Sequence, residues 1–159
     1  MNKMNKVLIA LDYDQSAKKV AEQGFLLAQT MGAQVVLLHV ISDPVYYAST
    51  EYSPIMGFTG NLDQYPLQFD TTKGLEKATL HFLEKFKEHL GDETIQTVVK
   101  NGDFSEAIVK TAKDLHADII VIGSHSRKWL EDIVMGSVTK EVLQHTTIPL
   151  FIIPTGKKG

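Results

Sequence analysis

The fold prediction for this chain starts from the stretch Ile119-Ile-Val-Ile-Gly-Ser-His-Ser-Arg-Lys-Trp-Leu-Glu-Asp-Ile-Val-Met-Gly-Ser-Val-Thr-Lys-Glu-Val-Leu143. Its first residues form an apolar strand that ends at Gly123, and Gly136 then opens a helix. Gly123 lets the backbone leave the strand with a positive φ angle. The unpaired N–H groups and the dipole at a helix start favour an anion. This layout is typical of a phosphate cradle, and it predicts a nucleotide ligand.

Strands and helices alternate on both sides of this stretch. Short continuous apolar runs predict strands that are buried on both faces, and apolar residues at helical spacing predict amphipathic helices. Ser16 is expected to cap the first helix, and Asp103 and Glu106 have the spacing of a capping box. Pro149 and Pro154 at the ends of the last strand predict an edge position. The predicted strands are 7–11, 34–40, 94–99, 118–122 and 150–153, and the predicted helices are 17–31, 72–90, one starting at Asp103, and 137–145.

Five strands that alternate with four helices predict an α/β fold, namely a doubly wound, open, five-stranded parallel sheet with helices on both faces, which is Rossmann-like. In such sheets, ligands bind beyond the carboxyl ends of the strands, where the winding direction reverses. Asp12 and Gly123 follow the first and fourth strands. If these strands are neighbours, the two residues face each other across one crevice.

The size and composition predict one domain, 1–159, in the cytoplasm. The 159 residues are 43% hydrophobic, enough for one sizeable core, and a long irregular loop is expected at about 43–70. The absence of cysteine fits a cytoplasmic protein. The net charge of -3 comes without a basic run, which argues against a nucleic-acid partner. No apolar run is long enough for insertion into a membrane.

The motif Gly123-x-x-Ser126, nine residues, then Gly136-Ser137 resembles the ATP-binding signature of the universal stress protein family, in which Gly-x-x-Gly precedes nine residues and Gly-Ser or Gly-Thr. The resemblance extends over nearly the whole chain, and it implies an adenine nucleotide α-hydrolase-like fold. Two positions depart from the pattern. Ser126 replaces the second glycine of the motif, and Tyr13 stands where the family usually has a glycine after its aspartate.

The resemblance also implies a set of ligand-binding residues. ATP, with Mg²⁺ near Ser137, would be the cofactor, and the protein side chains alone would build no metal centre. Around the adenine and ribose the resemblance places Ala10, Asp12 and Val40, and along the phosphates Gly123, Ser126, Arg127, Gly136, Ser137, Val138 and Thr139. The residue chemistry agrees independently, because helix N–H groups, a hydroxyl and an arginine all favour phosphate.

The expected function is that of a small cytoplasmic ATP-binding stress-response regulator. It would act as a nucleotide-occupied homodimer, paired through 149–154, with at most slow hydrolysis and with a possible regulatory protein partner. One alternative is that the glycines merely end a strand and start a helix, which would leave a nucleotide-free dimeric interaction module for a protein or transporter. An adenylate-forming enzyme is a further alternative, but the segment 12–16 lacks the glycines of that group's phosphate loop. Ser124 and His125 beside Asp12 lack the nucleophile-elbow sequence of a hydrolase.

Overall fold

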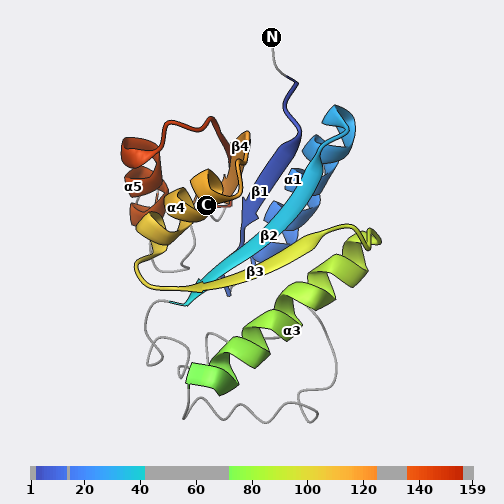
Figure 1. The fold of residues 1–159 in the computed structure, drawn as a ribbon, viewed down its shortest axis with the longest axis vertical. Coiled ribbons are helices and arrows are strands. Elements are labelled where there is room, and N and C mark those ends of the chain that lie inside the picture. The colour runs from blue at the N-terminus through green and yellow to red at the C-terminus, as the bar shows by residue number, and fades with distance from the viewer. Residues whose placement is uncertain (1–2, 14, 42–71, 125–135, 156–159) are drawn as a thin grey trace.

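The computed structural model describes residues 3–13, 15–41, 72–124 and 136–155 (Figure 1). The predicted loop at 43–70 and two predicted ligand residues, Ser126 and Arg127, lie outside these ranges. The described elements, in chain order, are β1 (Lys6–Ala10), α1 (Ala17–Met31), β2 (Gln34–Ile41), α3 (Thr72–Leu90), β3 (Gln96–Asn101), α4 (Phe104–Asp114), β4 (Ile119–Gly123), α5 (Ser137–His145) and β5 (Leu150–Ile153).

The five strands form one parallel sheet in the order β3-β2-β1-β4-β5. The central strand β1 pairs with β2 on one side, where Val7 lies opposite Val35, and with β4 on the other, where Val7 lies opposite Ile119. The winding direction therefore reverses between β1 and β4. This order confirms the predicted doubly wound fold and the edge position of β5.

Helices cover both faces of the sheet, and each face has its own core (Figure 1). Side chains alternate along a strand, so that in β1 Val7 and Ile9 pack on the side of α1 and α3, whereas Leu8 packs on the side of α4 and α5. The continuous apolar runs in the sequence follow from this arrangement, because both faces of the central strands are buried.

The predicted bounds agree closely with the structure. The bounds of α1, α3, α5 and β5 are those expected, and β3 shows the largest displacement, since it begins at Gln96 and not at residue 94. The Asp103 carboxylate accepts a 3.1 Å hydrogen bond from the Glu106 N–H, as the capping box predicts. Ser16 occupies the N-cap position of α1, as predicted, and its carbonyl accepts the first helical bond, from Val20. Its side chain, however, makes no cap hydrogen bond, and its backbone angles are helical.

Candidate functional site

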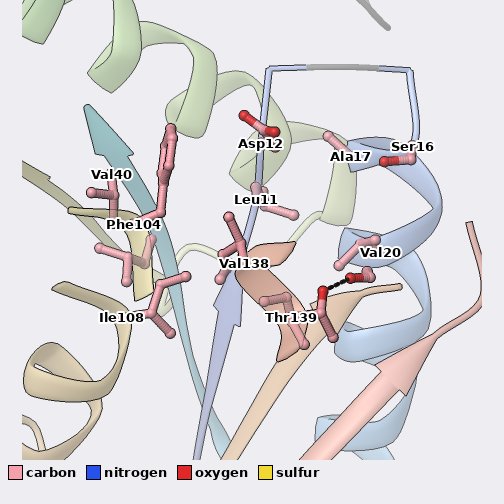
Figure 2. A pocket seen from close by; sticks show the side chains of 14 residues that line it. Leu11, Asp12, Ser16, Ala17, Val20, Val40, Phe104, Ile108, Val138 and Thr139 are labelled. Carbon is pink, nitrogen blue, oxygen red and sulfur yellow. Dashed lines mark hydrogen bonds between the residues drawn. The ribbon is translucent and has the colours of Figure 1, made fainter. Parts of the chain in front are cut away.

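A crevice opens at the carboxyl ends of β1 and β4, where the winding direction reverses (Figure 2). It holds about 560 Å³ of space that protein atoms leave empty, part of it open to solvent. Its described lining consists of Ala10, Leu11, Asp12, Ser16, Ala17, Val20, Leu38, Val40, Phe104, Ile108, Ile122, Gly123, Val138 and Thr139.

The described walls of this crevice are mainly apolar, and Asp12 is the charged side chain among them. Figure 2 shows Val40, Phe104 and Ile108 on one wall, with Val138 facing them from α5. A site of this kind suits a ligand with a flat apolar part and a few polar groups, because apolar walls provide affinity and a small number of polar groups fix the orientation.

Asp12 lies between two residues that are fixed in the core. Its Oδ1 atom accepts a 2.8 Å hydrogen bond from the Tyr13 N–H. The Tyr13 side chain is fully buried on the side of α1 and α3, and its hydroxyl donates to Thr79 Oγ1 at 2.7 Å. Burial raises the pKa of the Tyr13 phenol, so that it stays protonated. Tyr13, which replaces the glycine expected from the family pattern, is therefore a core residue that points away from the crevice.

The residue before Asp12 is held by a buried histidine. His39 Nδ1 lies 2.7 Å from the Leu11 carbonyl oxygen. Burial lowers the pKa of His39 to about 4, so the ring is neutral near pH 7. Because a carbonyl only accepts, Nδ1 must carry the proton and donate it. The imidazole also packs against the Tyr13 ring, at a centroid distance of 4.5 Å.

The prediction of a positive φ at Gly123 is wrong, since the described glycines with positive φ are Gly32, Gly91 and Gly102. Gly123 is needed for close packing. A Cβ atom there would lie 3.1 Å from a methyl of Val20 and 3.1 Å from a methyl of Thr155. Such contacts are tighter than ordinary van der Waals distances, so glycine lets α1 and the residues after β5 approach the end of β4.

The first turn of α5 is anchored beside Gly123. The Gly136 N–H donates to the Ser124 carbonyl at 2.6 Å, and the Thr139 hydroxyl donates to the Gly123 carbonyl at 2.8 Å. The first helical hydrogen bond runs from the Lys140 N–H to the Gly136 carbonyl. The N–H groups of 137–139 therefore have no acceptor within the helix, and at a helix N-terminus such donors favour an anion.

Six of the ten predicted ligand residues line the crevice, namely Ala10, Asp12, Val40, Gly123, Val138 and Thr139. Gly136 and Ser137 lie at the start of α5, next to Val138, but do not themselves line the described crevice. The sequence interpretation missed Phe104 and Ile108, which come from α4. Their spacing of four residues along one helix face, directly after the Asp103 cap, was the available signal.

The described residues show no group of three or more histidine, aspartate or glutamate side chains that could hold a metal ion. Within the same ranges, no helix has the length and apolar character needed to cross a membrane.

A family model described as the universal stress protein family matches residues 3–154. The chain belongs to the universal stress protein family. Among curated relatives, universal stress protein YxiE of Bacillus subtilis is 29% identical to this universal stress protein over 94% of this chain and 98% of its own length. Universal stress protein MJ0577 of Methanocaldococcus jannaschii is 26% identical over 93% of each chain.

Solved structures of universal stress proteins share this fold. The structure of MJ0577 superposes with a TM-score of 0.71, at 24% identity, over 99% of this chain and 100% of that one. A universal stress protein crystallised in complex with cAMP superposes with a TM-score of 0.64, at 16% identity, over 96% and 98% of the two chains. At this level of identity the structures establish the α/β architecture of this universal stress protein.

Proposed function

We propose that this universal stress protein is a cytoplasmic regulatory protein that binds ATP in the crevice between β1 and β4. The observation that carries the proposal is the meeting of three features in one crevice: apolar walls, the Asp12 carboxylate, and the N-terminal turn of α5. They match the base, the ribose and the phosphates of a nucleotide. The family member solved with cAMP, another adenine nucleotide, supports this assignment.

Each part of ATP has partners of suitable chemistry. The apolar wall of Val40, Phe104 and Ile108 accepts a planar base, because burial of its faces removes apolar surface from water. Asp12 accepts hydrogen bonds from ribose hydroxyls, and a carboxylate forms strong bonds of this type. The N–H groups of 137–139 donate to phosphate oxygens.

Magnesium would enter with the nucleotide. The exposed Ser137 at the start of α5 offers a hydroxyl oxygen, which is the ligand type that Mg²⁺ prefers. The phosphate oxygens of ATP would supply further ligands of the ion. Ser126 and Arg127 remain proposed phosphate partners on the resemblance alone.

The proposal also includes a homodimer, which would act as a regulator with ATP bound in its crevices. β5 is an edge strand, and Phe151 on it is 41% exposed. An apolar edge of this kind favours pairing with a second copy. No nucleophile with a positioned general base lines the described crevice, so any hydrolysis of ATP is expected to be slow.

Titration calorimetry with ATP, with and without Mg²⁺, tests the proposal. Wild-type protein should bind, Asp12→Asn should bind more weakly, and Asp114→Asn should bind like wild type because it removes the same charge at the far end of α4. At about 100 times the dissociation constant, ATP should add about 2.7 kcal/mol to the free energy of unfolding. If neither heat nor thermal stabilisation appears at millimolar ATP, the chain is instead a nucleotide-free interaction module.

A further inference from the structure

Asp12 reaches the crevice from a chain segment that is held by buried side chains on the α1 and α3 side of the sheet. The ladder of β1 with β2 ends at the bond from the Leu11 N–H to the Leu38 carbonyl, 2.9 Å long. Beyond this bond, the Leu11 carbonyl is held by the His39 side chain at 2.7 Å. The backbone just before Asp12 therefore depends on a side-chain donor.

The residue after Asp12 is held from the same α1 and α3 side. The Tyr13 ring packs between His39 and Phe82, with both centroid distances 4.5 Å. Its hydroxyl donates to Thr79 on α3 at 2.7 Å. Each residue of this cluster is at most 1% exposed, so none of them is expected to contact the ligand directly. The cluster consists of His39, Tyr13, Thr79 and Phe82.

The alternation of side chains explains how this buried cluster acts on the crevice. Tyr13 is buried in the core beneath α1 and α3 and does not line the crevice, whereas Asp12 before it does. When Leu11 and Tyr13 are both fixed, Asp12 has little freedom in its backbone. Its Oδ1 atom is further held by the Tyr13 N–H at 2.8 Å. A rigid polar group costs less entropy when it binds a ligand.

We propose that His39 and Tyr13 are positioning residues that set the Asp12 carboxylate for the ribose hydroxyls of the bound nucleotide. The inference rests on the proposed nucleotide function, and it adds two residues that never touch the ligand. His39 acts through the Leu11 carbonyl, and Tyr13 acts through its bond to Thr79 and through its own N–H. The prediction concerns selectivity for the sugar and not affinity for nucleotides in general.

The test compares ATP with 2′,3′-dideoxy-ATP, which lacks both ribose hydroxyls. Wild-type protein should prefer ATP by about tenfold, the value of one hydrogen bond to a charged group. His39→Leu removes the donor and should reduce this preference to about twofold. His39→Asn keeps an N–H donor near the position of Nδ1 and should retain most of the preference. Tyr13→Phe keeps the ring but loses the bond to Thr79, and should reduce the preference by an intermediate amount.

A purely structural role for His39 would weaken both nucleotides equally and leave the preference unchanged, and that result overturns the inference. If His39→Leu does not fold, an unchanged preference in Tyr13→Phe overturns it instead. Equal wild-type affinity for the two nucleotides also overturns it, while ATP binding stands. A wild-type protein that binds neither nucleotide removes the proposed function itself, and the positioning role with it.

Discussion

The side-chain hydroxyl of Thr139 donates a 2.8 Å hydrogen bond to the backbone carbonyl of Gly123. Thr139 lies in the first turn of α5, and Gly123 is the last residue of β4. Both residues line the crevice, and the Thr139 side chain is only 2% exposed. This bond therefore joins the helix that is proposed to bind phosphate to the strand end that carries the other wall of the site.

Thr139→Val should lower the free energy of unfolding by about 1 kcal/mol, because it leaves the partly buried Gly123 carbonyl without this donor. Thr139→Ser keeps the hydroxyl and should lose less. Urea unfolding of the two variants measures the difference. Equal stability of the Thr139→Val and Thr139→Ser proteins would show that the bond contributes nothing.

Gly136→Val should abolish ATP binding while leaving the fold intact. Gly136 has φ -64° and ψ 157°, which any residue adopts, so the substitution adds no backbone strain. The larger side chain would instead obstruct the N–H groups of the first turn of α5. Calorimetry gives the affinity, and far-ultraviolet circular dichroism checks the fold. Full ATP binding by a folded Gly136→Val protein would show that the phosphates do not bind at the start of α5.

Gly24→Ala should destabilise the protein, although alanine is the better helix residue. A Cβ atom at Gly24 would lie 2.8 Å from Ile9 Cδ1 and 3.1 Å from Val121 Cγ1. Overpacking of this kind costs about 1–3 kcal/mol, whereas alanine gains up to about 1 kcal/mol in a helix.

The matched background for this change is Ile9→Val, which removes the Cδ1 atom. There, Gly24→Ala should cost less than in the wild-type background, although contacts of 3.0 Å with Cγ1 of residue 9 and 3.1 Å with Val121 Cγ1 remain, and a double-mutant cycle of unfolding free energies gives the coupling. Additive effects would show that Ile9 is not the obstacle.

Acidification should destabilise the protein through His39. Its pKa is about 4 in the folded protein, compared with 6.5 for an ordinary histidine side chain, because burial disfavours the imidazolium. Between these pH values the unfolded chain binds more protons than the folded one, so stability falls as the pH falls. The loss attributable to His39 approaches about 3 kcal/mol near pH 4. His39→Asn should show a shallower pH dependence in urea unfolding between pH 7 and 4.5, and parallel curves for the two proteins would contradict the assignment.

Phe151→Lys should convert the proposed dimer into a monomer, because it places a charge on the exposed edge strand β5. Leu80→Lys is the control, since Leu80 is 45% exposed on α3, which packs against β3 at the opposite edge of the sheet. Light scattering at micromolar concentration measures the mass. A wild-type mass near the 17.7 kDa of one chain would rule out the dimer at that concentration.

Features that depend on local pattern were predictable from the sequence. The bounds of α1 and α5 follow from helical spacing and terminal glycines, and the parallel, doubly wound sheet follows from the alternation of strands and helices. Asp12 and Gly123 were placed in one crevice because the carboxyl ends of neighbouring parallel strands lie together.

The wrong prediction at Gly123 and the missed residue Phe104 depend on contacts between distant segments. Val20 and Thr155 lie so close to Gly123 that a Cβ atom there would crowd them. Both belong to other segments, so the sequence around Gly123 does not reveal this constraint. Phe104 lines the crevice because the packing of α4 on the sheet places the first residue of this helix near the carboxyl ends of the strands. The departure at Ser16 is local: Ser16 is at the N-cap position, but its helical backbone angles differ from the extended angles of a typical N-cap, and its hydroxyl makes no cap hydrogen bond.

The central position of β1 has a consequence for synthesis of the chain. β1 is made first, yet one of its two partners, β4, begins only at Ile119. A ribosome that adds about 5–20 residues per second needs roughly 10 s to reach that strand. During this time, the edge of β1 that later pairs with β4 exposes unpaired backbone groups, and Leu8 lacks the β4 and α5 residues that later pack around it. The nascent protein should therefore depend on chaperones until β4 emerges, and a chain that stops before Ile119 should aggregate.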